Sequence, residues 1–131
     1  MLLGPSHSGK TTTIKVVYEE LKKNYGATDA EPPKIVGEND VEAVLKCKGQ
    51  TVGIASMGDC SSYVIHYMSF YEGKGCDVLV CACRNNFSLP LKRLKSRYHN
   101  VNPPIRKIVA NDDDNSRAMN EIINQILNVT I

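Results

Sequence analysis

The 131-residue sequence lacks any apolar run approaching the 18 or more residues that a membrane-spanning helix needs. Its N-terminus also lacks a basic region followed by a long apolar segment, so we expect no signal peptide. Hydrophobic residues make up 42% of the chain and charged residues 23%, which is typical of a globular protein. These absences predict one cytoplasmic domain over residues 1–131, with no membrane as a partner.

Cysteine is present, but not at the spacing of a zinc or redox site. The chain has five cysteines, an odd number, and Cys81 and Cys83 are separated by one residue rather than by the two residues of a C-x-x-C motif. Both lie in an apolar run. We therefore predict buried thiols rather than a metal site.

Acidic residues are missing between Val78 and Asn111. The basic residues of the same stretch are Arg84, Lys92, Arg93, Lys95, Arg97, Arg106 and Lys107. This charge distribution has two interpretations. It predicts either a basic face, residues 84–107, that binds an anionic partner or nucleic acid, or an ordinary solvated surface.

What the sequence does contain is Gly4-Pro5-Ser6-His7-Ser8-Gly9-Lys10-Thr11, which fills every defined position of the phosphate-binding pattern G-x-x-x-x-G-K-[ST]. Glycines at 4 and 9 allow the backbone to curl, so that successive N–H groups face one hollow. The flanking residues fit this interpretation. Met1 to Leu3 predict a very short strand before the loop, and apolar residues at helical spacing predict a helix from Thr11 to about Asn24.

The motif resembles the Walker A motif of the P-loop NTPase superfamily, and Val52 to Asp59 resembles small, uncharacterised bacterial P-loop proteins described only as ATP-binding. The resemblance implies that Lys10 contacts the β and γ phosphates of a nucleoside triphosphate such as ATP, while the Thr11 hydroxyl binds Mg²⁺. The alternative is a glycine-rich turn that begins a helix and binds nothing. The implied nucleotide-binding residues are Gly4, Ser6, His7, Ser8, Gly9, Lys10, Thr11 and Thr12.

Two alternating segments, Val41 to Cys47 and Thr51 to Ala55, predict a hairpin that turns at Lys48-Gly49. In P-loop proteins an apolar strand beside the first one delivers an acidic residue to the Mg²⁺. Here Ser56 ends the apolar run, and Asp59 is the carboxylate in that neighbourhood. We expect Asp59 to bind the metal or to orient the attacking water. The alternative is that Asp59 caps the helix that we predict from Tyr63 to Tyr71.

A continuous apolar run from Asp77 to Cys83 predicts a buried parallel strand. Arg84 follows at its carboxyl end, where open α/β sheets bind ligands, so Arg84 either contacts a phosphate or pairs with a carboxylate. The basic helix that begins at Ser88 is either a lid, a grip on a nucleic-acid backbone, or a solvated face.

The C-terminal third predicts a last strand, Ile105 to Ala110, and a closing helix, Ser116 to Asn128. Between them, Asn111 to Asp114 has the outline of the guanine-reading motif N-K-x-D, with aspartate in place of the lysine. We interpret this segment as a helix cap and expect no guanine specificity.

The order of elements predicts an α/β protein with a three-layer α/β/α P-loop fold, its sheet mainly parallel with an antiparallel edge hairpin. We predict Mg²⁺-dependent binding and hydrolysis of a nucleoside triphosphate, with Lys10, Asp59 and Arg84 as catalytic residues and Thr11 and Asp59 as metal ligands. One alternative is a small nucleoside or nucleotide kinase, although the sequence between Gly26 and Gly49 leaves little room for an acceptor site. The other is a nucleotide-dependent regulatory module without catalysis.

Overall fold

The computed structural model describes residues 1–36, 40–97 and 105–128. Strands and helices alternate over most of this length. In chain order, the elements are β1 (Leu2–Leu3), α1 (Lys10–Asn24), β2 (Thr28–Asp29), β3 (Lys34–Val36), β4 (Asp40–Cys47), β5 (Gln50–Ala55), α2 (Ser61–Gly73), β6 (Val78–Cys83), α3 (Ser88–Arg97), β7 (Ile105–Arg106) and α4 (Asp112–Leu127).

The strands form one mixed sheet in the order β2-β4-β5-β6-β1-β7, with β3 also paired to β4. β1 runs parallel to β6 and β7, and β5 runs parallel to β6. β4 is antiparallel to its partners β2, β3 and β5. The α/β class is confirmed, but the sheet is only half parallel, because β4 gains two antiparallel partners from the segment before it.

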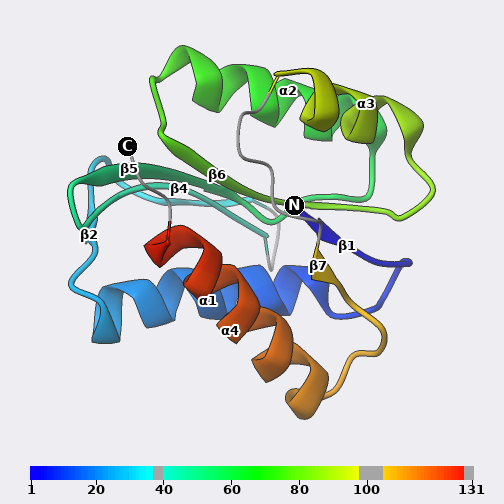
Figure 1. Cartoon of the computed structure of the whole chain (residues 1–131), viewed down its shortest axis with the longest axis horizontal. Coiled ribbons are helices and arrows are strands. Elements are labelled where there is room, and N and C mark those ends of the chain that lie inside the picture. The colour runs from blue at the N-terminus through cyan, green and yellow to red at the C-terminus, as the bar shows by residue number, and fades with distance from the viewer. Residues whose placement is uncertain (37–39, 98–104, 129–131) are drawn as a thin grey trace.

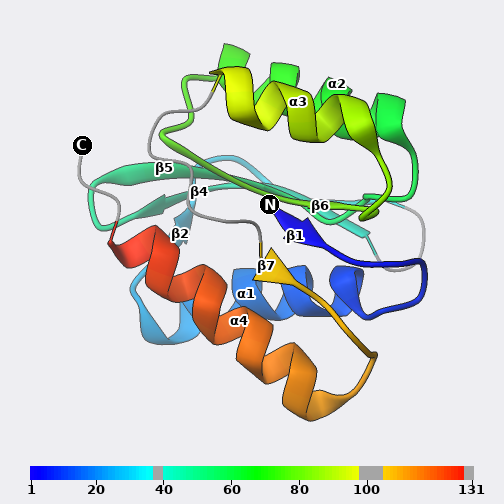
Figure 2. The same ribbon diagram turned by 45° about the vertical axis from the view of Figure 1, so that its right-hand side comes forward.

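Helices lie on both faces of the sheet, with α1 and α4 on one face and α2 and α3 on the other (Figures 1 and 2). Neighbouring residues of a strand point to opposite faces. Leu2 accordingly packs in the cluster that contains Ile14 and Ile122, whereas Leu3 packs with Val64 and Leu94. Both leucines are 1% exposed. The two-residue strand β1 is thus anchored in the core on both sides of the sheet.

Locally encoded elements agree with the sequence prediction. The helix α1 begins and ends within one residue of its predicted bounds. The hairpin turns at Lys48 and Gly49, whose φ angles of 50° and 80° are those of a tight two-residue turn. The predicted thiols are also present: all five cysteines are free, and Cys47, Cys81 and Cys83 are buried.

The strand order differs from the prediction in one respect that affects the site. We expected β5 to lie beside β1, but β6 lies between them. The last strand is also shorter than predicted, because it ends at Arg106 and residues 107–111 turn towards α4. None of the helices in the described ranges is both long and apolar enough to span a membrane.

Candidate functional site

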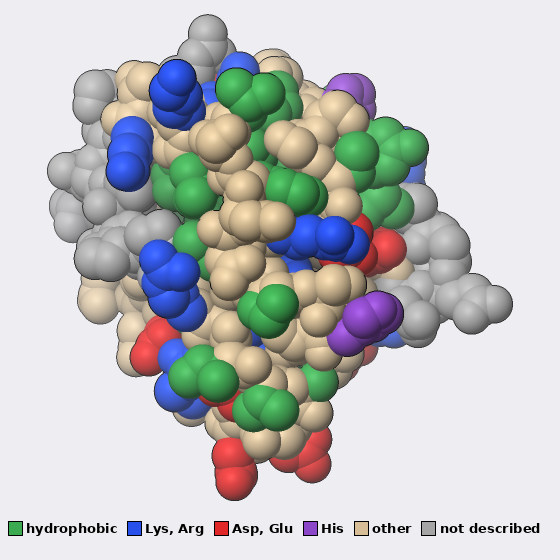
Figure 3. Space-filling model, turned by 90° about the vertical axis from the view of Figure 1, so that its right-hand side faces the viewer, with side chains coloured by type: hydrophobic (Ala, Val, Ile, Leu, Met, Phe, Trp, Pro, Cys, Tyr) green, Lys and Arg blue, Asp and Glu red, His purple; other side chains and the backbone are tan. Residues whose placement is uncertain are grey.

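Four loops meet at one edge of the sheet. The strands β1, β5, β6 and β7 all run in the same direction, so their carboxyl ends lie together. The loops that follow them begin at Gly4, Ser56, Arg84 and Lys107. Figure 3 shows the molecule from this side. A cavity of about 300 Å³ lies there, lined by His7, Ser8, Gly9, Lys10, Thr11, Thr12, Gly58, Asp59 and Ala110.

The glycine-rich loop, residues 4–12, holds its backbone N–H groups free of the protein's own carbonyls. At one end Gly4 N donates to Cys83 O at 3.2 Å, and beyond the other end Thr13 N donates to Gly9 O at 3.0 Å. Between these two bonds, where residues 6 and 7 form a turn, no amide of residues 6–12 donates to a backbone carbonyl with ordinary hydrogen-bond geometry among the described residues. Free N–H groups that face one hollow at a helix N-terminus are the elements of an anion site.

Two buried side chains add polar groups to this loop. Ser8 is 3% exposed, and its Oγ has no hydrogen-bond partner within the described part of the chain. Lys10 is 5% exposed and donates from Nζ to Gly4 O at 3.0 Å and to Pro5 O at 2.7 Å. Burial lowers the pKa of the Lys10 ammonium, Asp59 opposes that effect, and Arg84 adds to it. The loop therefore holds a desolvated cation close to Asp59 and Arg84.

Gly9 is required by the shape of the loop. Its φ of 88° lies in the left-handed region, and a Cβ placed there would come 2.7 Å from Asn115 Oδ1. Asn115 belongs to α4, which therefore packs directly against the loop.

The loop is also supported by a buried ion pair that sequence analysis missed. Lys107, counted above as part of the basic face, has a side chain with 0% exposure, and its Nζ lies 2.6 Å from Asp114 Oδ2. Lys107 N donates to Leu3 O at 2.6 Å, and Lys107 Cβ lies 3.0 Å from a Cβ placed at Gly4. The sequence gives no signal for this pairing, because three consecutive aspartates are equally plausible partners.

Asp59 reaches the cavity although β6 separates β5 from β1. The residue before it, Gly58, passes so close to β6 that a Cβ would lie 2.6 Å from the carbonyl carbon of Ala82. Asp59 Oδ1 accepts from Arg84 Nε at 3.3 Å, and the two side chains are 63% and 36% exposed. The structure therefore brings together Lys10, Asp59 and Arg84. The capping alternative for Asp59 is wrong, since the residue at the N-cap of α2 is Cys60.

Thr11 has a different carboxylate beside it. Thr11 Oγ1 lies 3.4 Å from Asp40 Oδ1, which also accepts from Ser56 Oγ at 2.9 Å. Our interpretation of Asp59 as the only carboxylate in this neighbourhood was therefore wrong. The sequence could have predicted that Asp40 lies here, because an antiparallel hairpin brings the start of its first strand, β4, next to the end of its second strand, β5.

A magnesium ion fits these donors only if a ligand completes its coordination. Among the described residues, no group of three or more His, Cys, Asp and Glu side chains could hold a metal ion. However, Mg²⁺ is usually bound through one or two carboxylates together with substrate phosphates and water. The Thr11 hydroxyl and a nearby carboxylate satisfy that requirement.

The basic residues of 84–107 do not form one face. Arg84 pairs with Asp59, Arg93 pairs with Glu72 at 2.7 Å, and Lys107 is buried. The remaining described cations, Lys92, Lys95 and Arg106, are exposed. The side chain of Arg97 lies outside the described part of the chain. Figure 3 shows basic side chains spread over this side of the molecule rather than gathered in one patch.

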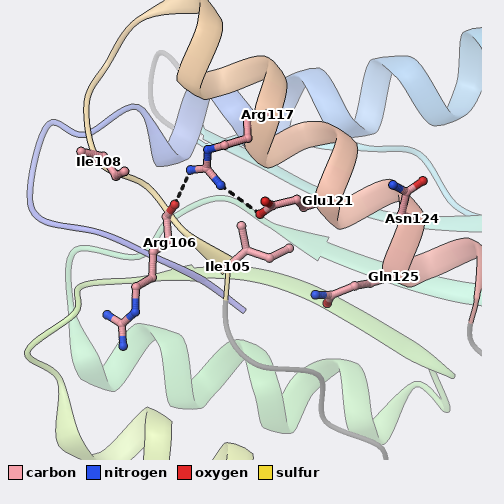
Figure 4. A pocket seen from close by; sticks show the side chains of 7 residues that line it. All are labelled: Ile105, Arg106, Ile108, Arg117, Glu121, Asn124 and Gln125. Atoms are coloured by element: carbon pink, nitrogen blue, oxygen red, sulfur yellow. Dashed lines mark hydrogen bonds and ion pairs between the residues drawn. The ribbon is translucent and has the colours of Figure 1, made fainter.

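A larger hollow, of about 530 Å³, lies along β7 and α4 (Figure 4). Its walls are formed by Ile105, Arg106, Ile108, Arg117, Glu121, Asn124 and Gln125. Arg117 spans it and donates to Glu121 and to the carbonyl oxygen of Arg106. No residue of the glycine-rich loop lines this hollow, and Arg117, one of the two cations in its walls, is already paired. We therefore place the candidate site in the smaller cavity.

Comparisons with protein-family models, with curated proteins and with solved structures find no match to this chain. Any assignment of function therefore depends on the residues and the geometry described above.

Proposed function

We propose that this protein binds a nucleoside triphosphate, with Mg²⁺, in the cavity over the glycine-rich loop and hydrolyses it. The observation that carries the proposal is the set of N–H groups of residues 6–12, none of which donates to a backbone carbonyl with ordinary hydrogen-bond geometry among the described residues. The first N–H groups of a helix need water or a ligand as acceptors, and within this stretch Ser8 and Lys10 are buried, whereas Ser6, His7 and Thr12 are exposed. The unpartnered Oγ of the buried Ser8 beside these amides supports the same conclusion.

The phosphates would replace water as the acceptors of these amides, and Lys10 would supply the positive charge. Its Nζ donates to two loop carbonyls in the structure. Arg84, which is partly exposed, would leave Asp59 and bind the γ phosphate, where it would stabilise the negative charge that develops in the reaction. Asp59, released from Arg84, would then accept a hydrogen bond from the attacking water.

Hydrolysis in this site needs no covalent intermediate. The water oxygen forms a bond to the γ phosphorus, the bond to the bridging oxygen breaks, and the diphosphate leaves with that electron pair. The proton of the water passes to solvent or to Asp59. When bound, Mg²⁺ would neutralise charge on the phosphate oxygens, and Thr11 would be its ligand from the loop.

The loop after β7 argues against recognition of a guanine base by this segment. Asp114 occupies the position of the aspartate in the guanine-reading outline, but its oxygens already accept from the side chains of Lys107 and Arg117 and from two backbone amides. Asn111 Oδ1 accepts from Asp114 N and caps α4, as we predicted. Neither side chain is available to the donors of a guanine base. Together with the helices on both faces of the sheet, the loop supports assignment to the three-layer P-loop fold.

The proposal is tested by the ligand-induced change in unfolding temperature for ATP and GTP with Mg²⁺. A ligand at about 100 times its dissociation constant stabilises the folded state by about 2.7 kcal/mol. We expect Lys10→Ala to abolish this ligand-induced shift. Lys23→Ala is the matched control, because Lys23 is an exposed lysine at the other end of the same helix.

The shift, rather than the unfolding temperature itself, is compared because Lys10 also bonds to the loop in the absence of ligand. Equal shifts in the wild type and in Lys10→Ala would reject the site. With γ-labelled ATP, hydrolysis releases labelled phosphate, whereas a kinase would transfer the label to an added nucleoside. Binding without release of phosphate would favour the regulatory module.

A further inference from the structure

The start of β4 is held against the end of β5 by a pair of reciprocal hydrogen bonds. Ser56 N donates to Val41 O at 3.0 Å, and Val41 N donates to Ser56 Oγ at 2.8 Å. These bonds extend the antiparallel register in which Glu42 lies opposite Ala55. As a result Asp40, the first residue of β4, is placed at the carboxyl edge of the sheet with the glycine-rich loop.

Ser56 also orients the carboxylate of Asp40. Its hydroxyl donates to Asp40 Oδ1 at 2.9 Å, and the residue is 1% exposed. The single hydroxyl proton is therefore used on Asp40, while the oxygen accepts from Val41 N. With its proton donated to Asp40 and one of its two lone pairs used by Val41 N, the buried Ser56 is better suited to position Asp40 than to bind a metal itself.

The oriented oxygen of Asp40 is the one that lies 3.4 Å from the Thr11 hydroxyl. Two ligands on adjacent corners of an octahedron with bonds of about 2.1 Å are roughly 3 Å apart. The pair is therefore close to the separation that one Mg²⁺ requires. Both are hard oxygen donors, and Asp40 is the carboxylate that the Thr11 hydroxyl contacts, while Asp59 lines the same cavity as Thr11.

Asp59 is less suited to the same role. It lines the cavity, but it is 63% exposed and its Oδ1 is paired with Arg84. Once released from Arg84, Asp59 is used on the attacking water in the proposed reaction, so as a metal ligand it would have to serve two roles at once. Asp40 has no such competitor, since its described partners are the hydroxyl groups of Ser56 and Thr11.

We propose that Asp40, positioned by Ser56, is the carboxylate that holds the Mg²⁺ of the bound nucleotide, in the role that the sequence suggested for Asp59. Thr11 and the phosphates supply the other non-water ligands. This inference rests on the proposed function. It separates the two aspartates: Asp40 binds the metal, and Asp59 pairs with Arg84 until nucleotide binds and then accepts from the attacking water.

The test measures ATP affinity by calorimetry, once with Mg²⁺ and once with EDTA. The readout is the ratio of the two affinities, which a purely structural defect does not change. Asp40→Asn should reduce this ratio, the Mg²⁺ enhancement of ATP affinity, by at least about tenfold. The ATP affinity measured in EDTA should stay within about twofold of wild type. Ser56→Ala should reduce the enhancement less, and Asp40→Glu should retain part of it. Asp59→Asn is the matched control and should keep the wild-type ratio.

The possible results are distinguishable. If Asp40→Asn keeps the wild-type ratio, or if Asp59→Asn loses it instead, the metal assignment is overturned while the nucleotide site stands. If the wild type binds ATP neither with nor without Mg²⁺, the proposed function fails and this inference fails with it. If Asp40→Asn does not fold, Asp40→Glu and Ser56→Ala decide the question, because a wild-type ratio in both would contradict a ligand at this position.

Discussion

The ion pair beneath the glycine-rich loop should be the most sensitive electrostatic feature of the fold. In Asp114→Asn, the ammonium of Lys107 would keep 0% exposure but lose its carboxylate. Removing one partner of a buried pair usually costs 3–5 kcal/mol, because the other charge stays buried without compensation. We expect the lower end, about 3 kcal/mol, since the asparagine oxygen can still accept from Lys107 Nζ.

A loss of this size is readily measured. For a chain of 131 residues, 3 kcal/mol corresponds to a fall of roughly 10 °C in unfolding temperature. Urea unfolding followed by circular dichroism gives the free energy directly. The matched control is Asp113→Asn, an exposed aspartate in the same first turn of α4, which should cost less than about 1 kcal/mol through the helix dipole. Equal losses in the two variants would refute the reasoning.

The pH dependence gives a second measure of the same pair. The Lys107 ammonium, together with the amide of Ile108, holds the pKa of Asp114 well below its usual value. The stability that Asp114 contributes is therefore fully present above the pKa of the unfolded chain, about 4, and is lost as the pH falls below it. The difference between wild type and Asp114→Asn should be constant from pH 5 to 7 and shrink below pH 4. A difference independent of pH down to 2 would contradict this account.

Two further predictions concern the loop between β5 and α2. Gly58→Ala would place a Cβ 2.6 Å from the Ala82 carbonyl, so we expect the free energy of unfolding in urea to fall by about 1–3 kcal/mol and ATP binding to weaken. Gly73→Ala is the control and should leave ATP binding unchanged, because a Cβ at Gly73 meets nothing within 4 Å. The Ser62 hydroxyl and nearby amides lower the pKa of the Cys60 thiol, while burial raises that of Cys83 to about 12. Mass spectrometry after brief iodoacetamide treatment at pH 7.5 should find Cys60 alkylated first, and equal labelling of both thiols would contradict this.

Much of the local structure was predictable because the signals are local. The helix α1 follows from the spacing of Ile14, Val17 and Leu21, which are all fully buried. The hairpin follows from two alternating segments and a Lys48-Gly49 turn. The glycine-rich loop was recognisable because Gly4 and Gly9 have steric reasons to be glycine: a Cβ at either position would meet Ser8, Lys107 or Asn115.

The strand order and the polar pairings were not predictable in the same way. Whether β5 or β6 lies beside β1 depends on packing between segments far apart in the chain, and periodicity does not report it. Lys107 has the sequence environment of a surface residue, and only its approach to Asp114 explains its burial. Asp40 is the first residue of β4 and precedes the alternating segment that predicted the strand, so no apolar run points to it, although the predicted hairpin already implied that it lies beside Ser56.

The position of β6 explains how Asp59 and Asp40 come to lie on different sides of this site. With β6 between β1 and β5, the loop after β5 must cross the end of β6, and the close approach of Gly58 to Ala82 marks that crossing. The crossing carries Asp59 to Arg84, which itself follows β6. It leaves Ser56 beside β4, where the serine hydroxyl contacts Asp40 rather than a phosphate. The carboxylate that contacts the Thr11 hydroxyl therefore comes from β4, and it is that of Asp40.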